Sequence, residues 1–310
     1  MTGLRLIFAG SGAFGLPTLR SLGGEVVQVV SQPDRPAGRG RKLVATPIAQ
    51  WAMENHLPLL RTERINEEKL EAADAMVVIA FGQKISREQA DRPRLGSVNL
   101  HGSLLPLCRG AAPIPWTILS GRTFTGNSVI RLAERMDAGA ILGQSRIEIG
   151  PVETAGELHD RLAEDGAALV ARVLSDLAAG KAVETAQDES QATRASKLSR
   201  RDALSDWSAN AESIALRIRA LWPWPRCHAK VVDAAGGDVA RVALVRARAA
   251  ISEGPRWHPG EIEASGDVCA GNGGAVEILE LQPEGGRVMK LDEYRRGHRW
   301  TAGLRLESPA

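Results

Sequence analysis

The chain has 310 residues, of which 44% are hydrophobic, and its formal net charge is +2. This length predicts two domains with a core in each, and the near-neutral charge neither favours nor excludes a polyanionic partner. No apolar run approaches the roughly 20 residues that span a bilayer, and no signal peptide precedes the first expected strand. The three cysteines are odd in number and far apart. We therefore expect a cytoplasmic protein with reduced thiols, no metal site and no membrane partner.

The first part of the chain alternates strands with helices. A helix is expected at 46–55, and strands are predicted at 4–9, 26–30, 75–80, 97–101 and 128–132. Apolar runs separated by helices are typical of a mostly parallel, doubly wound sheet, whose sites lie at the carboxyl ends of the strands. A long amphipathic helix at 155–179 completes an α/β domain that we expect to span residues 1–189.

The character of the sequence changes after this helix. Residues 191–201 read QATRASKLSRR, with four basic side chains and no acidic one, which indicates a basic linker that we place at 190–203. A helix is expected at 210–220, followed by short alternating runs interrupted by pairs of glycines. This pattern predicts a small antiparallel barrel in residues 204–310.

A glycine motif follows the first strand. Residues 10–15 read GSGAFG and match the G-x-G-x-x-G pattern of dinucleotide-binding turns. The acidic residue that should bind the ribose would be Asp34, which lies instead in the loop Gln32-Pro33-Asp34-Arg35-Pro36. We favour a packing role for these glycines over binding of a nicotinamide or flavin cofactor.

The most informative residues lie at the end of the strand 97–101. Asn99 and His101 are two positions apart, so their side chains project from one face of the strand, and a turn at Gly102-Ser103 follows at once. Asp137 follows the strand 128–132. An amide donor, an imidazole and a carboxylate that orients it suit acyl-type transfer. Strand-end polar residues that only satisfy backbone groups are the alternative.

The loop at 36–42 reads PAGRGRK and places three cations in four positions, Arg39, Arg41 and Lys42. A solvated basic loop is one interpretation, and a contact with the phosphates of an RNA is the other. From residue 204 onward, fourteen Lys or Arg balance fourteen Asp or Glu, so the second domain is not basic overall.

Taken together, these segments resemble the methionyl-tRNA formyltransferase branch of the 10-formyltetrahydrofolate-dependent formyltransferase family, nearly from end to end. The family signature is present as Asn99, His101, Ser103–Pro106 and Asp137. The segments 32–40, 109–114, 195–199 and 218–225 resemble the tRNA-specific branch. The chain departs from it at Leu107-Cys108, at Ser11-Gly12 and at Phe81, where a tyrosine is more usual.

The resemblance implies a Rossmann-like formyltransferase domain joined to an OB-like barrel that assists tRNA binding. It implies transfer of the formyl group of 10-formyltetrahydrofolate to the α-amino group of methionyl-initiator tRNA by a monomer, through a tetrahedral intermediate and without a metal or a covalent enzyme intermediate. Asn99 and His101 would stabilise the oxyanion, and Asp137 would orient His101. The residues implied to bind folate are Ser103, Leu104, Leu105, Pro106, Phe81 and Gly82. Those implied to bind tRNA are Arg39, Arg41 and Lys42.

Two other functions remain open at this point. The first is formyl transfer to a small amine such as an amino-sugar nucleotide, with another role for the barrel. The second is an RNA-binding or regulatory protein with an inactive transferase domain.

Overall fold

The computed structural model describes residues 3–37, 40, 42–252 and 258–308, which form two compact units. Unit 1 contains the residues up to 113, 124–147 and 159–195, and unit 2 contains 114–123, 148–158 and the chain from 196 onward. The chain passes from unit 1 to unit 2 for the last time between residues 195 and 196, within the linker predicted at 190–203. The segments 114–123 and 148–158, which we expected in the first domain, cluster with unit 2.

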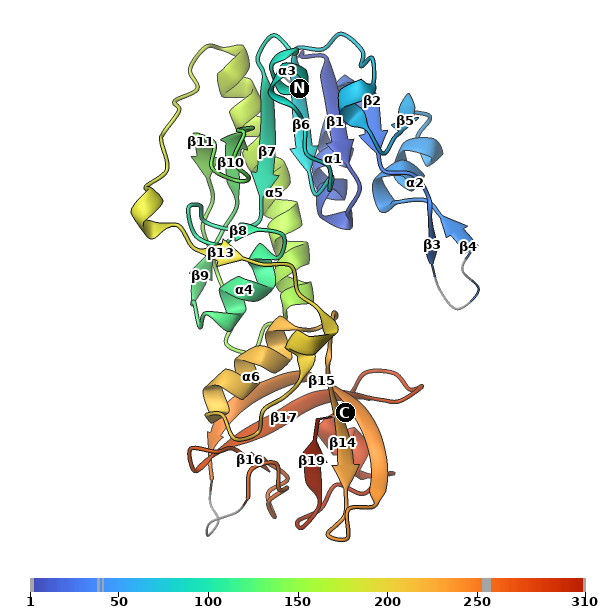
Figure 1. Cartoon of the computed structure of the whole chain (residues 1–310), viewed down its shortest axis with the longest axis vertical. Helices are drawn as coiled ribbons and strands as arrows, with labels where there is room; N and C mark the ends of the chain where they lie inside the picture. Colours follow the sequence, from blue (N-terminus) through green and yellow to red (C-terminus); the bar gives the residue numbers. More distant parts are fainter. Residues whose placement is uncertain (1–2, 38–39, 41, 253–257, 309–310) are drawn as a thin grey trace. The chain divides into compact units, whose positions relative to one another are not determined.

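Unit 1 is built on a seven-stranded sheet with the order β11-β10-β7-β6-β1-β2-β5 (Figure 1). Its strands are β1 (Leu6–Gly10), β2 (Val26–Ser31), β5 (Leu59–Arg61), β6 (Ala75–Ile79), β7 (Ser97–His101), β10 (Ser128–Arg131) and β11 (Ile141–Gln144). Five neighbouring strands, β7 to β5, are parallel, while β10 runs antiparallel to both β7 and β11. The prediction of a mostly parallel, Rossmann-like sheet is confirmed.

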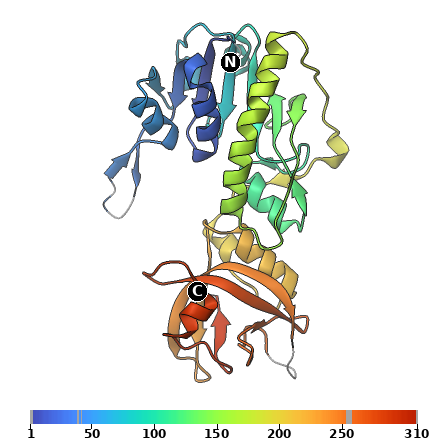
Figure 2. The same cartoon turned by 180° about the vertical axis from the view of Figure 1, so that it is seen from behind.

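Helices pack on this sheet because their apolar faces meet its buried strands. They are α1 (Leu16–Leu22), α2 (Pro47–Glu54), α3 (Arg87–Asp91) and α5 (Ala155–Ala178), with the short 3-10 turn η3 at Ile65–Glu67. Helix α2 begins after Thr46, whose hydroxyl accepts a hydrogen bond from the Ala49 amide. Helix α5 lies along the sheet (Figure 2). It approaches β7 closely, because a Cβ at Gly166 would come within 2.6 Å of the Leu100 side chain. This close approach fixes the strand that ends at His101.

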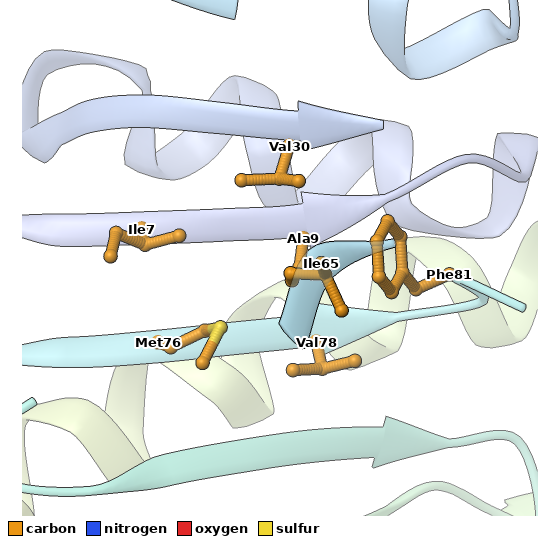
Figure 3. Close-up of a cluster of buried hydrophobic side chains, with 7 residues drawn as sticks. All are labelled: Ile7, Ala9, Val30, Ile65, Met76, Val78 and Phe81. Atoms are coloured by element: carbon orange, nitrogen blue, oxygen red, sulfur yellow. The ribbon is translucent and has the colours of Figure 1, made fainter. Parts of the chain in front are cut away.

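The face of the sheet opposite α5 holds a cluster of buried hydrophobic side chains (Figure 3). Its members are Ile7, Ala9, Val30, Ile65, Met76, Val78 and Phe81. Strands buried on both faces need apolar residues at every position, which explains the continuous apolar runs in the sequence.

The space beside the glycines of the GSGAFG motif is filled by other side chains of the protein. A Cβ at Gly10 would lie 2.8 Å from the Phe8 ring, and one at Gly15 would lie 3.1 Å from the same ring. Asp34 forms an ion pair with Arg61 at 3.4 Å. These contacts support the packing role that we favoured for the motif.

Unit 2 is an antiparallel, barrel-like sheet with the order β16-β17-β15-β14-β19, and β18 pairs with β17. Its strands are β14 (Cys227–Val232), β15 (Asp238–Ile251), β16 (Val268–Cys269), β17 (Gly274–Pro283), β18 (Met289–Lys290) and β19 (Arg305–Glu307). Isolated bridges join Ile262 to Val268 and Glu261 to Arg305. The helices are α4 (Pro113–Leu119), α6 (Ala211–Ala220) and α7 (Leu291–Arg295). The predicted barrel is confirmed.

Short strand pairs complete the described structure: β3 (Arg35–Ala37) with β4 (Lys42–Val44), β8 (Arg109–Gly110) with β13 (Arg194–Ala195), and β9 (Phe124–Thr125) with β12 (Ile147–Glu148). None of the helices in the described ranges is both long and apolar enough to cross a membrane.

Candidate active site

The candidate site lies in unit 1 at the carboxyl end of β7. His101 is the last residue of this strand and is 7% exposed, while Asn99 is half-buried two positions earlier. Both residues pair with β10, Asn99 opposite Ile130 and His101 opposite Ser128. Asn99 and His101 therefore lie at the end of a strand, as the sequence predicts.

The His101 ring is held by a backbone carbonyl. Its Nε2 atom lies 2.9 Å from the Cys108 carbonyl oxygen, which can only accept, so Nε2 carries the hydrogen. The other ring nitrogen, Nδ1, lies 3.7 Å from Asp137 Oδ2. A neutral ring with a proton on Nε2 presents a lone pair at Nδ1. Nδ1 is therefore the ring nitrogen that faces the Asp137 carboxylate and that is not already engaged with backbone.

Asp137 is aimed by its backbone and by a neighbouring loop. Its φ is 55°, a left-handed conformation in the turn after β10, and its Oδ2 accepts a hydrogen bond of 2.8 Å from the Gly110 amide. The separation of 3.7 Å from His101 is longer than a hydrogen bond. A small closure of the turn, or a bridging water, would connect the two groups.

The Asn99 side chain is free to act on a ligand. Within the described ranges, no protein group hydrogen-bonds to its amide, and the residue is half-buried. Asn99 therefore offers an unused N–H donor on the strand that carries His101.

The loop that follows β7 is fixed by internal hydrogen bonds. The Ser128 hydroxyl donates to the Ser103 carbonyl at 2.7 Å and accepts from the Leu105 amide at 3.0 Å. Ser103 and Leu105 are buried, and the Ser103 hydroxyl donates to the Leu107 carbonyl. Of the four residues expected to line a folate site, Leu104 and Pro106 are thus the ones with partly exposed side chains.

Phe81 and Gly82 follow the neighbouring strand β6. The Phe81 ring is 2% exposed and lies in the hydrophobic cluster (Figure 3), while its carbonyl accepts a hydrogen bond of 2.7 Å from the Gln32 side chain. Gly82 is exposed with φ 80°, and a Cβ there would lie 2.5 Å from Gln32 Nε2. Phe81 therefore presents its backbone to this edge of the sheet, and Gly82 allows the Gln32 side chain to pack closely against it.

Of the three cations expected to bind tRNA, Arg39 and Arg41 lie outside the described residues. Lys42 begins β4 and is exposed, next to the exposed side chains of Leu43 and Val44.

Three residues near the site were not identified from the sequence as functional: Gln187, Glu189 and Cys108. Gln187 hydrogen-bonds to the turn of Asp137, and Glu189 forms ion pairs with Arg109 and Arg135. Hydrogen bonding from Arg109, followed by that from Arg135, lowers the pKa of Glu189 to about 2. No local pattern marks the contacts of Gln187 and Glu189, because they join residues that are 48 or more positions apart.

Among the residues that the structure describes, no group of three or more His, Cys, Asp or Glu side chains is arranged to hold a metal ion. The local chemistry is that of an amide, an imidazole and a carboxylate.

Comparison with known proteins bears on this site. A formyl transferase domain profile matches residues 17–174, and a profile of the formyl transferase C-terminal domain matches residues 197–299. The methionyl-tRNA formyltransferase of Geobacter sulfurreducens is 39% identical over 99% of this chain and 98% of its own length. The protein of that name from Methylococcus capsulatus is 40% identical over 98% of this chain and 99% of its own length.

Solved structures show the same fold at low identity. An N-formyltransferase from Helicobacter canadensis, in complex with folinic acid and dTDP-3-aminofucose, has a TM-score of 0.65 at 15% identity and covers 89% of this chain and 98% of its own. HypX from Aquifex aeolicus, in complex with tetrahydrofolic acid, has a TM-score of 0.59 at 18% identity and covers 96% of this chain and 48% of its own.

Proposed function

This chain belongs to the formyl transferase family, and from that premise we propose that it transfers the formyl group of 10-formyltetrahydrofolate to the α-amino group of methionyl-initiator tRNA. The observation that carries the proposal is the unused Asn99 amide beside the His101–Asp137 pair, in a chain that is similar over its whole length to methionyl-tRNA formyltransferases.

Asn99 acts on the oxygen of the formyl group. When the neutral amine attacks the formyl carbon, negative charge develops on that oxygen, and a fixed N–H donor stabilises this charge more in the transition state than in the ground state. The family resemblance also implies a hydrogen bond from His101 to this oxygen. The hydrogen bond of its Nε2 to Cys108 leaves that role to Asn99.

His101 and Asp137 carry the proton. The new bond joins the amine nitrogen to the formyl carbon, and the bond from that carbon to the folate nitrogen breaks. The amine must therefore lose a proton and the leaving nitrogen must gain one. His101 Nδ1 accepts this proton, directly or through a water, and Asp137 stabilises the imidazolium until the proton is passed on.

The folate co-substrate is assigned to the edge formed by the loop 103–106 and by Gly82. The partly exposed Leu104 and Pro106 suit the flat face of a pterin ring, and Gly82 is exposed just after the neighbouring strand β6. When bound, this group supplies the activated formyl carbon. The buried Ser103 and Leu105 act by holding the loop in place.

The tRNA is assigned to Lys42 together with Arg39 and Arg41, because closely spaced cations follow a phosphate backbone of irregular shape. We further propose a cytoplasmic monomer whose barrel domain assists tRNA binding.

The test is formylation of methionyl-initiator tRNA by the purified full chain, with 10-formyltetrahydrofolate as donor and a dTDP-amino sugar as the competing acceptor. The proposal expects formylmethionyl-tRNA as the product. Formylation of the sugar alone would assign the small-amine function, and folate binding without any transfer would assign an inactive, RNA-binding role.

A further inference from the structure

Gln187 joins the two loops that hold the ends of the His101–Asp137 pair. It lies in unit 1 on the segment that follows α5, and its side-chain amide uses both of its ends. The Nε2 atom donates to the carbonyls of Asp137 and Gly139, both at 2.8 Å. One amide group therefore clamps the turn that carries the carboxylate.

The other end of the Gln187 amide holds Arg109. Its Oε1 atom accepts hydrogen bonds from the Arg109 guanidinium at 2.7 and 3.0 Å, and Glu189 forms paired bonds with the same guanidinium at 2.8 and 3.1 Å. The Arg109 side chain is 11% exposed. Paired, partly buried bonds of this kind fix an arginine in one orientation.

Arg109 lies between the two backbone groups that contact the catalytic pair. The carbonyl of Cys108 accepts the hydrogen bond of His101 Nε2, and the amide of Gly110 donates to Asp137 Oδ2. The strand pair β8–β13 and the bond from the Cys108 amide to the Thr193 hydroxyl attach this loop to the same segment. Gln187 thus links the loop at 108–110 directly to the turn at 137–139.

We propose that Gln187 is a positioning residue for formyl transfer, which sets the distance between His101 Nδ1 and Asp137 Oδ2 and acts only through that pair. The proposal rests on the function proposed above. At 3.7 Å, the pair lies just outside hydrogen-bonding distance, so a shift of a few tenths of an ångström in the turn changes how well Asp137 stabilises a proton on His101.

Two variants test the proposal. Gln187→Leu removes both sets of contacts while keeping most of the side-chain volume. Gln187→Glu keeps an acceptor for Arg109 but removes the donor to the Asp137 and Gly139 carbonyls. In steady-state formylation of methionyl-tRNA, we expect each variant to lower kcat about 10- to 100-fold, because misplacement of a catalytic group by about 1 Å has an effect of that order. KM for both substrates should stay within about twofold of wild type. Gln191→Ala is the matched control, since Gln191 is an exposed glutamine on the same segment whose hydrogen bonds within the described ranges go to Asp188.

The decisive readout is the double variant with Asp137→Ala. If Gln187 acts only by setting the His101–Asp137 distance, Gln187→Leu lowers the residual rate no further once the Asp137 carboxylate is absent. A kcat within threefold of wild type in the single variants, an equal loss in the Asp137→Ala background, or loss of the folded state in Gln187→Glu would each overturn the proposal. Absence of formylation by the wild-type chain would instead overturn the proposed function.

Discussion

Replacing Ser128 with alanine tests whether the loop of the folate site is held rigid by a single hydroxyl. Ser128 is fully buried, and its hydroxyl satisfies the Leu105 amide and the Ser103 carbonyl, while Gln144 donates to it at 2.8 Å. The Ser128→Ala variant removes the three buried hydrogen bonds of this hydroxyl, each contributing about 0.5–1.5 kcal/mol, and leaves only the bond of 3.2 Å from the Leu105 amide to the Ser103 carbonyl to close this turn. We expect the free energy of unfolding to fall by about 3 kcal/mol.

This loss is measurable by thermal unfolding of the full chain. For a unit of this size, about 3 kcal/mol corresponds to a decrease in Tm of roughly 6–12 °C. Ser175→Ala is the control, because Ser175 is exposed on α5 in the same unit. We expect the Kd for 10-formyltetrahydrofolate to rise with the loss of the ordered loop. A Tm within 2 °C of wild type, with unchanged folate binding, would refute the argument that Ser128 organises this loop.

Three further outcomes follow from the described contacts. Asn99→Ala should lower kcat about 10²- to 10³-fold with KM unchanged, as for a lost oxyanion donor, and a change confined to KM would contradict that role. Glu157→Gln should lower the free energy of unfolding by about 1 kcal/mol at pH 7, since Arg246 lowers the pKa of Glu157 to about 2 in the folded chain. This stabilisation is complete above the ordinary pKa of 4.5 and is lost as the pH falls toward 2. In urea unfolding, the free energies of wild type and Glu157→Gln should therefore converge near pH 2. A difference between them that does not change with pH would argue against the ion pair. Lys42→Ala should reduce the slope of log Kd for tRNA against log salt concentration by about 1. The control Lys69→Ala, at another exposed lysine, should leave this slope unchanged. Equal slopes for wild type and both variants would remove Lys42 from the tRNA site.

Much of the fold follows from local patterns in the sequence. The central strands β1, β2, β6 and β7 were predicted within a few residues, because strands buried on both faces require uninterrupted apolar runs. The long helix α5 followed from its helical periodicity. The clustering of 114–123 and 148–158 with unit 2 depends on contacts distant in sequence, which no local pattern records.

Phe81 shows why a position near a strand end does not settle where a side chain points. Alternation along β6 would place Phe81 on the face opposite Met76 and Val78. Ala80 adopts a left-handed conformation with φ 45°, which interrupts the alternation, and the Phe81 ring lies with Met76 and Val78 in the hydrophobic cluster. A left-handed alanine has no signature in the sequence, so this turn could not be foreseen.

The pair Asn99 and His101 was predictable because a two-residue spacing on a strand fixes a common face. The contact of His101 with Asp137 was an expectation from residue chemistry and family resemblance. The loops that aim these side chains could not be derived, since the bonds of Gln187, Arg109 and Gly110 join backbone and side-chain groups across 27 to 80 positions.

The most direct test of the account is the single-turnover rate of formyl transfer to methionyl-initiator tRNA by the wild-type chain and by His101→Ala and Asp137→Ala. If His101 carries the proton and Asp137 stabilises it, each substitution lowers the rate by two or more orders of magnitude, or about 3 kcal/mol at the transition state, while tRNA and folate binding persist. A rate within threefold of wild type in either variant would contradict the assignment.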